Sequence, residues 1–114
     1  MTYLLNAFSP SMLVEGEALI KPVNEDWFRG ELLKGFTSAV SHAITAEILS
    51  KRGGIPVKFN RKSVSLKPYN TALIAVPQVR FQEAREYTLA EVQNARFNFY
   101  VVMVSWYFTE VKEC

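Results

Sequence analysis

The sequence contains a single histidine, His42, upstream of a strongly basic segment. Residues 51–85 hold eight basic residues and one acid, Glu83, whereas the rest of the chain holds five basic and ten acidic residues. An imidazole exchanges a proton near neutral pH, and guanidinium groups bind phosphate oxygens. These residue types predict acid–base chemistry on a phosphodiester that carries its own nucleophile, as RNA does with its 2′-hydroxyl. The same features also occur in proteins where a lysine-rich loop is merely solvated and an exposed histidine has no role.

Other kinds of chemistry find little support in the sequence. One histidine and one cysteine, Cys114, supply no zinc-binding set, and no carboxylates recur at ligand spacing. Phosphate-binding glycine motifs are absent, and Gly53 and Gly54 are typical of a helix end. The sequence therefore predicts a metal-independent site with no cofactor.

The composition is that of a globular protein. Hydrophobic residues make up 49% of the chain and charged residues 21%. No apolar run approaches the roughly 18 residues of a membrane span, the N-terminus lacks a secretory signal pattern, and Cys114 has no second cysteine for an intrachain disulfide. We expect one domain, residues 1–114, that has no membrane partner and is cytoplasmic, in the host cytoplasm if the protein is viral.

Residue patterning predicts an α/β fold. Apolar, β-prone runs predict strands at 2–8, 18–23, 71–78 and 97–108, with a hairpin of 55–59 and 63–66. Helices are expected at 25–34 after an Asn24 cap, from a Thr37 or Ser38 cap to about Lys51, and after a capping box at Thr88. In the run 97–108 both alternating faces are apolar, which indicates a strand covered on both sides. The prediction is a single domain with a mixed sheet of about five strands flanked by helices.

The helix expected to contain His42 is apolar on two faces. Val40, Ile44 and Ile48 share one helical face and are predicted to pack in the core. His42 falls on the opposite face, where its neighbours are small or apolar: Thr45, Ala46 and Leu49. This second face is predicted to meet a ligand or another subunit.

Four short motifs in order resemble one family, the viral ring nucleases that act as anti-CRISPR proteins against type III CRISPR immunity. The motifs are Leu5 to Ser9, Ser41 to Ala46, Phe59 to Arg61, and Arg80 to Arg85 before the Thr88 cap. The resemblance extends over nearly the whole chain, to about Met103.

The resemblance implies cleavage of the second messenger cyclic tetra-adenylate by a homodimer that binds the ring across its two-fold axis. It implies catalytic roles for His42 and Glu83, phosphate binding by Arg61 and Arg80, and a ligand-lining loop at Asn6 and Ser9. The chain departs from the family pattern at three places. Ser41 replaces a usual glycine, Val79 replaces a glutamine that is here Gln78, and Gln82-Glu83-Ala84 replaces Glu-Glu-Gly.

Together these inferences predict a mechanism in which the ribose 2′-oxygen attacks the adjacent phosphate and His42 protonates the departing 5′-oxygen. Glu83 is expected to orient His42 or the 2′-hydroxyl, or to act as a base. Two alternatives remain: a non-catalytic protein that sequesters a cyclic oligonucleotide, and a viral nucleic-acid-binding or structural protein. The basic residues form no continuous stripe, so stable binding of duplex nucleic acid is not expected.

Overall fold

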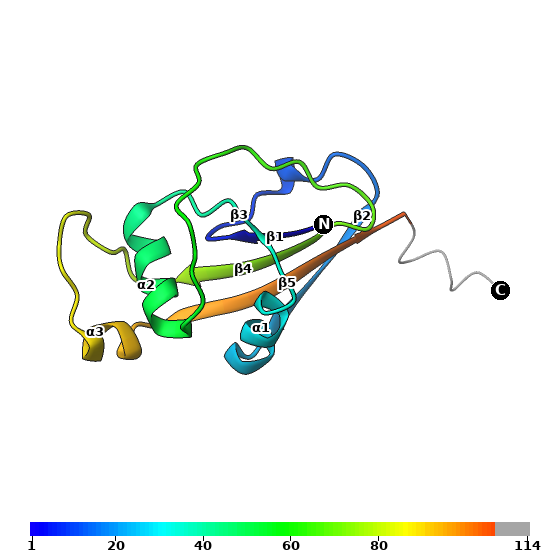
Figure 1. Cartoon of the computed structure of the whole chain (residues 1–114). Helices are drawn as coiled ribbons and strands as arrows, with labels where there is room; N and C mark the ends of the chain where they lie inside the picture. Colours follow the sequence, from blue (N-terminus) through cyan, green and yellow to red (C-terminus); the bar gives the residue numbers. More distant parts are fainter. Residues whose placement is uncertain (107–114) are drawn as a thin grey trace.

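The computed structural model describes residues 1–106, which form one α/β domain (Figure 1). Its elements in chain order are β1 (Thr2–Leu5), the 3₁₀ turn η1 (Pro10–Met12), β2 (Glu17–Val23), α1 (Glu25–Leu32), β3 (Thr37–Ser38), α2 (Ala43–Gly53), β4 (Thr71–Pro77), α3 (Leu89–Asn94) and β5 (Phe97–Ser105). The predicted fold class, a single domain with a mixed five-stranded sheet and flanking helices, is confirmed.

The sheet has the strand order β2-β5-β4-β1-β3. β1 lies between β4 and β3 and runs parallel to both, with Tyr3 opposite Ala72 on one side and Thr37 on the other. β5 runs antiparallel to both β4 and β2. Consequently the carboxyl ends of β1, β3 and β4 meet at one edge of the sheet.

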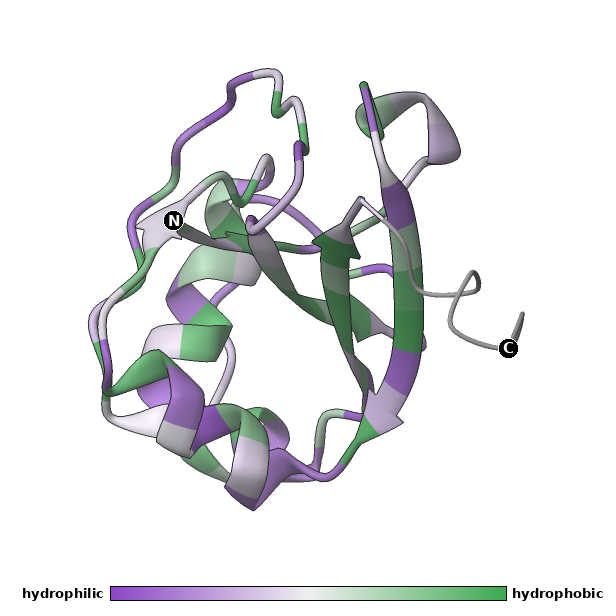
Figure 2. Ribbon diagram, turned by 90° about the vertical axis from the view of Figure 1, so that its right-hand side faces the viewer, coloured by the Kyte–Doolittle hydropathy of each residue, from purple (hydrophilic) through white to green (hydrophobic). Residues whose placement is uncertain are grey.

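Each face of the sheet is covered by a separate hydrophobic core. On one face, Val101 and its alternating neighbours in β5 pack with the three helices. On the other face, Val102 and Val104 pack with the irregular segments that contain Met12 and Leu66. Figure 1 shows the helices on one side of the sheet and these segments on the other, and Figure 2 shows the most apolar residues on the central strands. The prediction that β5 is covered on both faces is confirmed.

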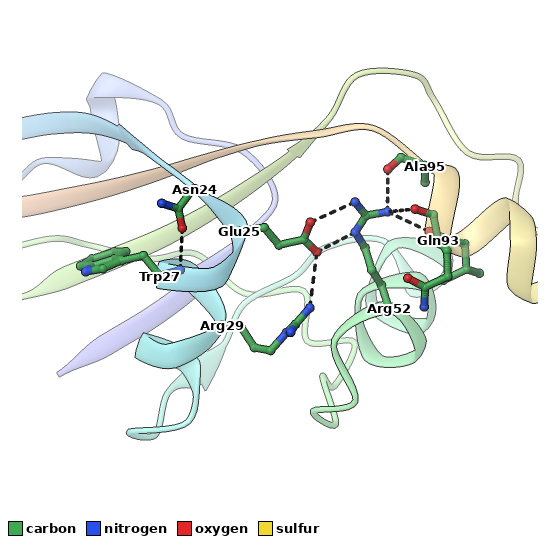
Figure 3. Close-up of polar contacts among 8 residues, drawn as sticks. Asn24, Glu25, Trp27, Arg29, Arg52, Gln93 and Ala95 are labelled. Atoms are coloured by element: carbon green, nitrogen blue, oxygen red, sulfur yellow. Dashed lines mark hydrogen bonds and ion pairs between the residues drawn. The ribbon is translucent and has the colours of Figure 1, made fainter.

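Arg52 ties the three helices together (Figure 3). Its guanidinium donates two hydrogen bonds to the Glu25 carboxylate at the start of α1, at 2.7 and 3.0 Å. It also donates to the carbonyls of Val92, Gln93 and Ala95, at 2.7–2.9 Å, at the end of α3. A cation at a helix C-terminus satisfies carbonyls that lack intrahelical partners. One side chain of α2 thereby fixes the positions of α1 and α3.

The prediction that α2 begins after a cap at Thr37 or Ser38 was wrong. Thr37–Ser38 is strand β3, and α2 begins at Ala43 with His42 as its N-cap. Serine and threonine are favoured helix caps, but here the backbone pairs with β1, and the buried Ser38 hydroxyl donates to the Lys58 carbonyl at 2.6 Å. Pairing between distant segments overrode the local signal.

The prediction that His42 shares an exposed helical face with Thr45, Ala46 and Leu49 was also wrong. Thr45, Ala46 and Leu49 are only 3%, 2% and 9% exposed and are buried within the protomer. Because His42 precedes the helix, it does not share a helical face with them. The core positions predicted for Val40, Ile44 and Ile48 are confirmed.

The predicted hairpin of 55–59 and 63–66 does not form. Phe59 instead makes a parallel bridge with Val40, and Leu66 makes one with Leu13. The two runs pair with different parts of the chain, so they do not pair with each other. β5 ends at Ser105, and residues 107–108 of its predicted range lie outside the described residues. Within residues 1–106, no helix has the length and apolar character to cross a membrane.

The Arg52 contacts yield a stability prediction. Arg52→Met keeps the aliphatic part of the side chain but leaves the carbonyls at the end of α3 without their hydrogen-bond donor. We expect it to lower the free energy of unfolding by about 2–4 kcal/mol. Arg29→Met is the matched control, because Arg29 is 42% exposed and approaches Glu25 only at 4.0 Å; we expect it to cost less than about 1 kcal/mol. Denaturant titration measures both, and equal losses would contradict the assigned role of Arg52.

Candidate functional site

A pocket of about 360 Å³ lies at the sheet edge where β1, β3 and β4 end. Ligand sites in α/β folds favour this position, because loops from several strands converge there. Four of the six predicted site residues line the pocket: Asn6, His42, Arg80 and Glu83. The remaining lining residues are Ile44, Thr45, Val76, Pro77, Gln78, Val79 and Phe81.

His42 stands at the junction between the chain leaving β3 and helix α2. Its side chain is exposed and makes no capping hydrogen bond to the helix. Asn6, which directly follows β1, fixes the preceding residue: its Oδ1 accepts from the Ser41 amide at 3.1 Å and from the Ser41 hydroxyl at 3.2 Å. Asn6 therefore anchors the backbone that presents the imidazole.

The first turn of α2 contributes to the same pocket through Ile44 and Thr45. The first amides of an α-helix lack intrahelical acceptors, and the helix dipole places partial positive charge there. Together with an imidazole, this end of α2 favours an anionic group such as a phosphate.

Arg80 and Glu83 reach the pocket from the segment that follows β4. Gln78 fixes the start of this segment, because its amide donates to the Arg96 carbonyl at 2.9 Å and its side chain donates to Asn98 at 3.0 Å. Within residues 1–106, Arg80 and Glu83 are exposed and form no ion pair. The pocket thus offers a cation, a carboxylate and an imidazole to a ligand.

The far end of this segment is fixed by the predicted capping box. The Thr88 hydroxyl accepts from the Glu91 amide at 3.2 Å, and the Glu91 carboxylate accepts from the Thr88 amide at 2.9 Å. The hydrogen bond from the Thr88 amide is the main cause that lowers the pKa of Glu91 below its ordinary value of 4.5, and the nearby Arg85 guanidinium lowers it further. This carboxylate therefore stabilises the start of α3 in its ionised form.

The structure places Ser9 and Arg61 outside this pocket. The Ser9 hydroxyl lies 3.0 Å from that of Ser11, at the start of η1. Arg61 follows Asn60, whose amide donates to the Val40 carbonyl at 2.9 Å. Arg61 is therefore on a segment adjacent to the one that carries His42, and its predicted phosphate contact remains a prediction.

Two further polar residues line the pocket: Thr45, which was predicted only as part of a helical face shared with His42, and Gln78, which was not predicted. Thr45 lies one helical turn after His42 and lines the pocket even though it is 3% exposed. Gln78 stands at the end of β4. A signal for Gln78 was present in the family's glutamine, displaced here by one place. Among the described residues, no group of three histidine, cysteine or acidic side chains gathers as a metal site would require.

Comparison with known proteins identifies a family and similar solved structures. The model of the STIV B116-like family matches residues 2–99. The solved structure of B116 of Sulfolobus turreted icosahedral virus (STIV) is similar, with a TM-score of 0.78 and 25% sequence identity, covering 90% of this chain and 97% of that one. No curated protein matches the sequence. Both matches include the strands and loops that form the pocket.

The role of Asn6 can be tested through stability. We expect Asn6→Ala to lower the free energy of unfolding by about 1–2 kcal/mol, because it removes both hydrogen bonds to Ser41. Ser41→Ala removes only the hydroxyl contact and should cost about half as much. Thermal or chemical denaturation measures the difference, and a larger loss for Ser41→Ala would refute the anchoring role of Asn6.

The lowered pKa of Glu91 predicts a pH dependence. A carboxyl whose pKa is lower in the folded state contributes stability above its ordinary pKa, and this contribution disappears as the pH falls through the lowered value. The difference in unfolding free energy between the native protein and Glu91→Gln should therefore be largest near neutral pH and shrink below pH 4.5. A difference that stays constant with pH would contradict this assignment.

Proposed function

The chain belongs to the STIV B116-like family, a viral protein family, and from that premise we propose that it is a metal-independent ring nuclease that opens cyclic tetra-adenylate. The single observation that carries the proposal is the convergence of His42, Glu83 and Arg80 on one pocket at the sheet edge. Cyclic tetra-adenylate is the messenger that activates type III CRISPR effector nucleases. By destroying it in the host cytoplasm, the protein inhibits this immunity.

In the proposed reaction the RNA supplies the nucleophile. The ribose 2′-oxygen forms a bond to the adjacent phosphorus, and the bond from phosphorus to the 5′-oxygen breaks in line with it. His42, as imidazolium, gives its proton to the departing 5′-oxygen, while Glu83 takes the proton of the 2′-hydroxyl or orients the group. The product is a linear chain with a 2′,3′-cyclic phosphate at one end and a 5′-hydroxyl at the other.

The surroundings of the pocket support stabilisation of the transition state. Negative charge builds up on the phosphoryl oxygens as the 2′-oxygen attacks. Arg80 has no ion-pair partner among the described residues, so its guanidinium is available to these oxygens. The first-turn amides of α2 add positive potential beside His42. Such preorganised charge is often the largest contribution to catalysis.

The size of the pocket fits part of a cyclic tetra-adenylate ring, and the symmetry of that ring supports a dimer. A volume of about 360 Å³ falls at the lower end of the roughly 300–1,000 Å³ typical of ligand pockets, and it suits part of a nucleotide ring rather than all of it. A cyclic tetranucleotide with four equal units presents equivalent phosphates to two subunits related by a two-fold axis. In the proposed homodimer each pocket cleaves one of two opposite phosphodiesters, and two linear dinucleotides result.

The proposal is tested by incubating the purified protein, in the presence of EDTA, with cyclic tri-, tetra- and hexa-adenylate, and resolving the products. We expect substoichiometric protein to convert the tetramer ring to linear dinucleotides. Binding without product formation would instead support a sequestering protein. Equal affinity for linear DNA, falling steeply with salt, would support the nucleic-acid-binding alternative.

The role of His42 is tested by His42→Ala. Loss of the general acid should lower kcat by about 10²–10⁴-fold, while affinity for the ring changes little. Glu47→Ala is the matched control, because Glu47 is an exposed residue of α2 outside the pocket. Calorimetric binding and single-turnover kinetics provide the two readouts, and full turnover by His42→Ala would exclude the proposed mechanism.

A further inference from the structure

The aromatic ring of Tyr87 is fixed at the base of the loop that carries Glu83. It packs against the core that contains Phe97 and meets the ring of Phe81 edge-on, with centroids 5.7 Å apart. Phe81 in turn lies against Phe97 at 5.8 Å. These contacts hold the Tyr87 ring by packing against the core and against Phe81 of the same loop.

From this fixed ring, the hydroxyl of Tyr87 reaches back across the loop. It accepts a hydrogen bond from the backbone amide of Gln82 at 2.9 Å. Gln82 immediately precedes Glu83, so the contact restrains the backbone next to the pocket carboxylate. The next residue, Ala84, adopts a positive φ of 64°, a conformation that costs energy for a residue other than glycine and persists only where its surroundings enforce it.

The other side of the loop is held by Arg85. Its guanidinium lies 4.4 Å from the centroid of the Tyr87 ring and pairs with the Glu91 carboxylate. Glu83 and Ala84 thus span the gap between two residues, Gln82 and Arg85, that both contact Tyr87. Both ends of this part of the loop are therefore held by the Tyr87 side chain.

We infer that Tyr87 is a positioning residue, whose hydroxyl sets the place of Glu83 through the Gln82 amide. Tyr87 does not line the pocket, so it acts on the reaction only through the loop. This inference rests on the proposed function, because it assigns Glu83 a part in catalysis. Ala84 adopts its positive φ between two residues that both contact Tyr87, and a tether at Tyr87 accounts for how a residue other than glycine is held in this conformation.

Tyr87→Phe tests the inference because it deletes the hydroxyl and keeps the ring. Loss of one hydrogen bond to the loop should lower kcat for the tetramer ring roughly two- to tenfold, with KM unchanged and only a small decrease in the melting temperature. Tyr100→Phe is the matched control: it removes a hydroxyl from a half-buried tyrosine on the other face of the sheet and should leave kcat unchanged. A Tyr87→Phe protein with native kcat would overturn the inference.

A double-mutant comparison separates positioning from general damage. If Tyr87 acts through Glu83, Tyr87→Phe should have almost no further effect on kcat in a Glu83→Gln background. An equal fold-loss in both backgrounds would overturn the inference.

Amide hydrogen exchange followed by NMR is independent of catalysis. The Gln82 amide should be protected in the native protein and exchange faster in Tyr87→Phe, and an unprotected native Gln82 would also overturn the inference. If the native protein cleaves no ring while Gln82 behaves as expected, the proposed function fails and the tether stands.

Discussion

Parallel pairing of β1 with both of its neighbours is the constraint on which the site depends. β1 is only four residues long, Thr2–Leu5, yet it contributes Leu4 and Leu5 to the two opposite cores. Its hydrogen bonds to β3 and β4 give all three strands the same direction. Asn6, the extended residues Ser41 and His42, and the segment after Pro77 therefore emerge side by side. The residues of the pocket come from segments far apart in sequence, and this pairing brings those segments together.

The pocket residues are held with different rigidity. His42 lies on a short extended segment that is anchored by Asn6 and by the helix that begins directly after it. Glu83 lies in a longer loop that is restrained at its ends. Arg52 joins α2, which carries the His42 side of the pocket, to α3, which ends that loop. Arg52 consequently fixes the His42 side of the pocket and the end of the Glu83 loop relative to each other, although their local restraints differ. This arrangement suits the proposed function, in which the histidine stays aligned with the phosphodiester while the loop accommodates the ring.

Sequence reasoning succeeded where the signal was local and failed where distant pairing decided. The Asn24 cap, the Thr88–Glu91 capping box and the two apolar faces of β5 are all confirmed, since each depends on neighbouring residues. β3 was missed because two residues carry no periodic pattern and gain their strand conformation from β1. For the site, the charge pattern indicated an anionic ligand, but the grouping of Asn6, His42, Arg80 and Glu83 came from the family resemblance. Ser9 and Arg61 lie outside the pocket, where the loops following β1 and α2 take courses that no local pattern indicates.

We propose that this strand-end pocket holds a phosphodiester with its 5′-oxygen beside His42. A crystal structure with cyclic tetra-adenylate whose 2′-hydroxyls are replaced by hydrogen tests it most directly, because that ring lacks the nucleophile and stays intact. We expect the ring to span two subunits, with a His42 ring nitrogen within hydrogen-bond distance, about 2.6–3.2 Å, of a bridging 5′-oxygen and Arg80 on the same phosphate. A ring bound elsewhere on the protein, or in this pocket with His42 turned away from every phosphate, would contradict it.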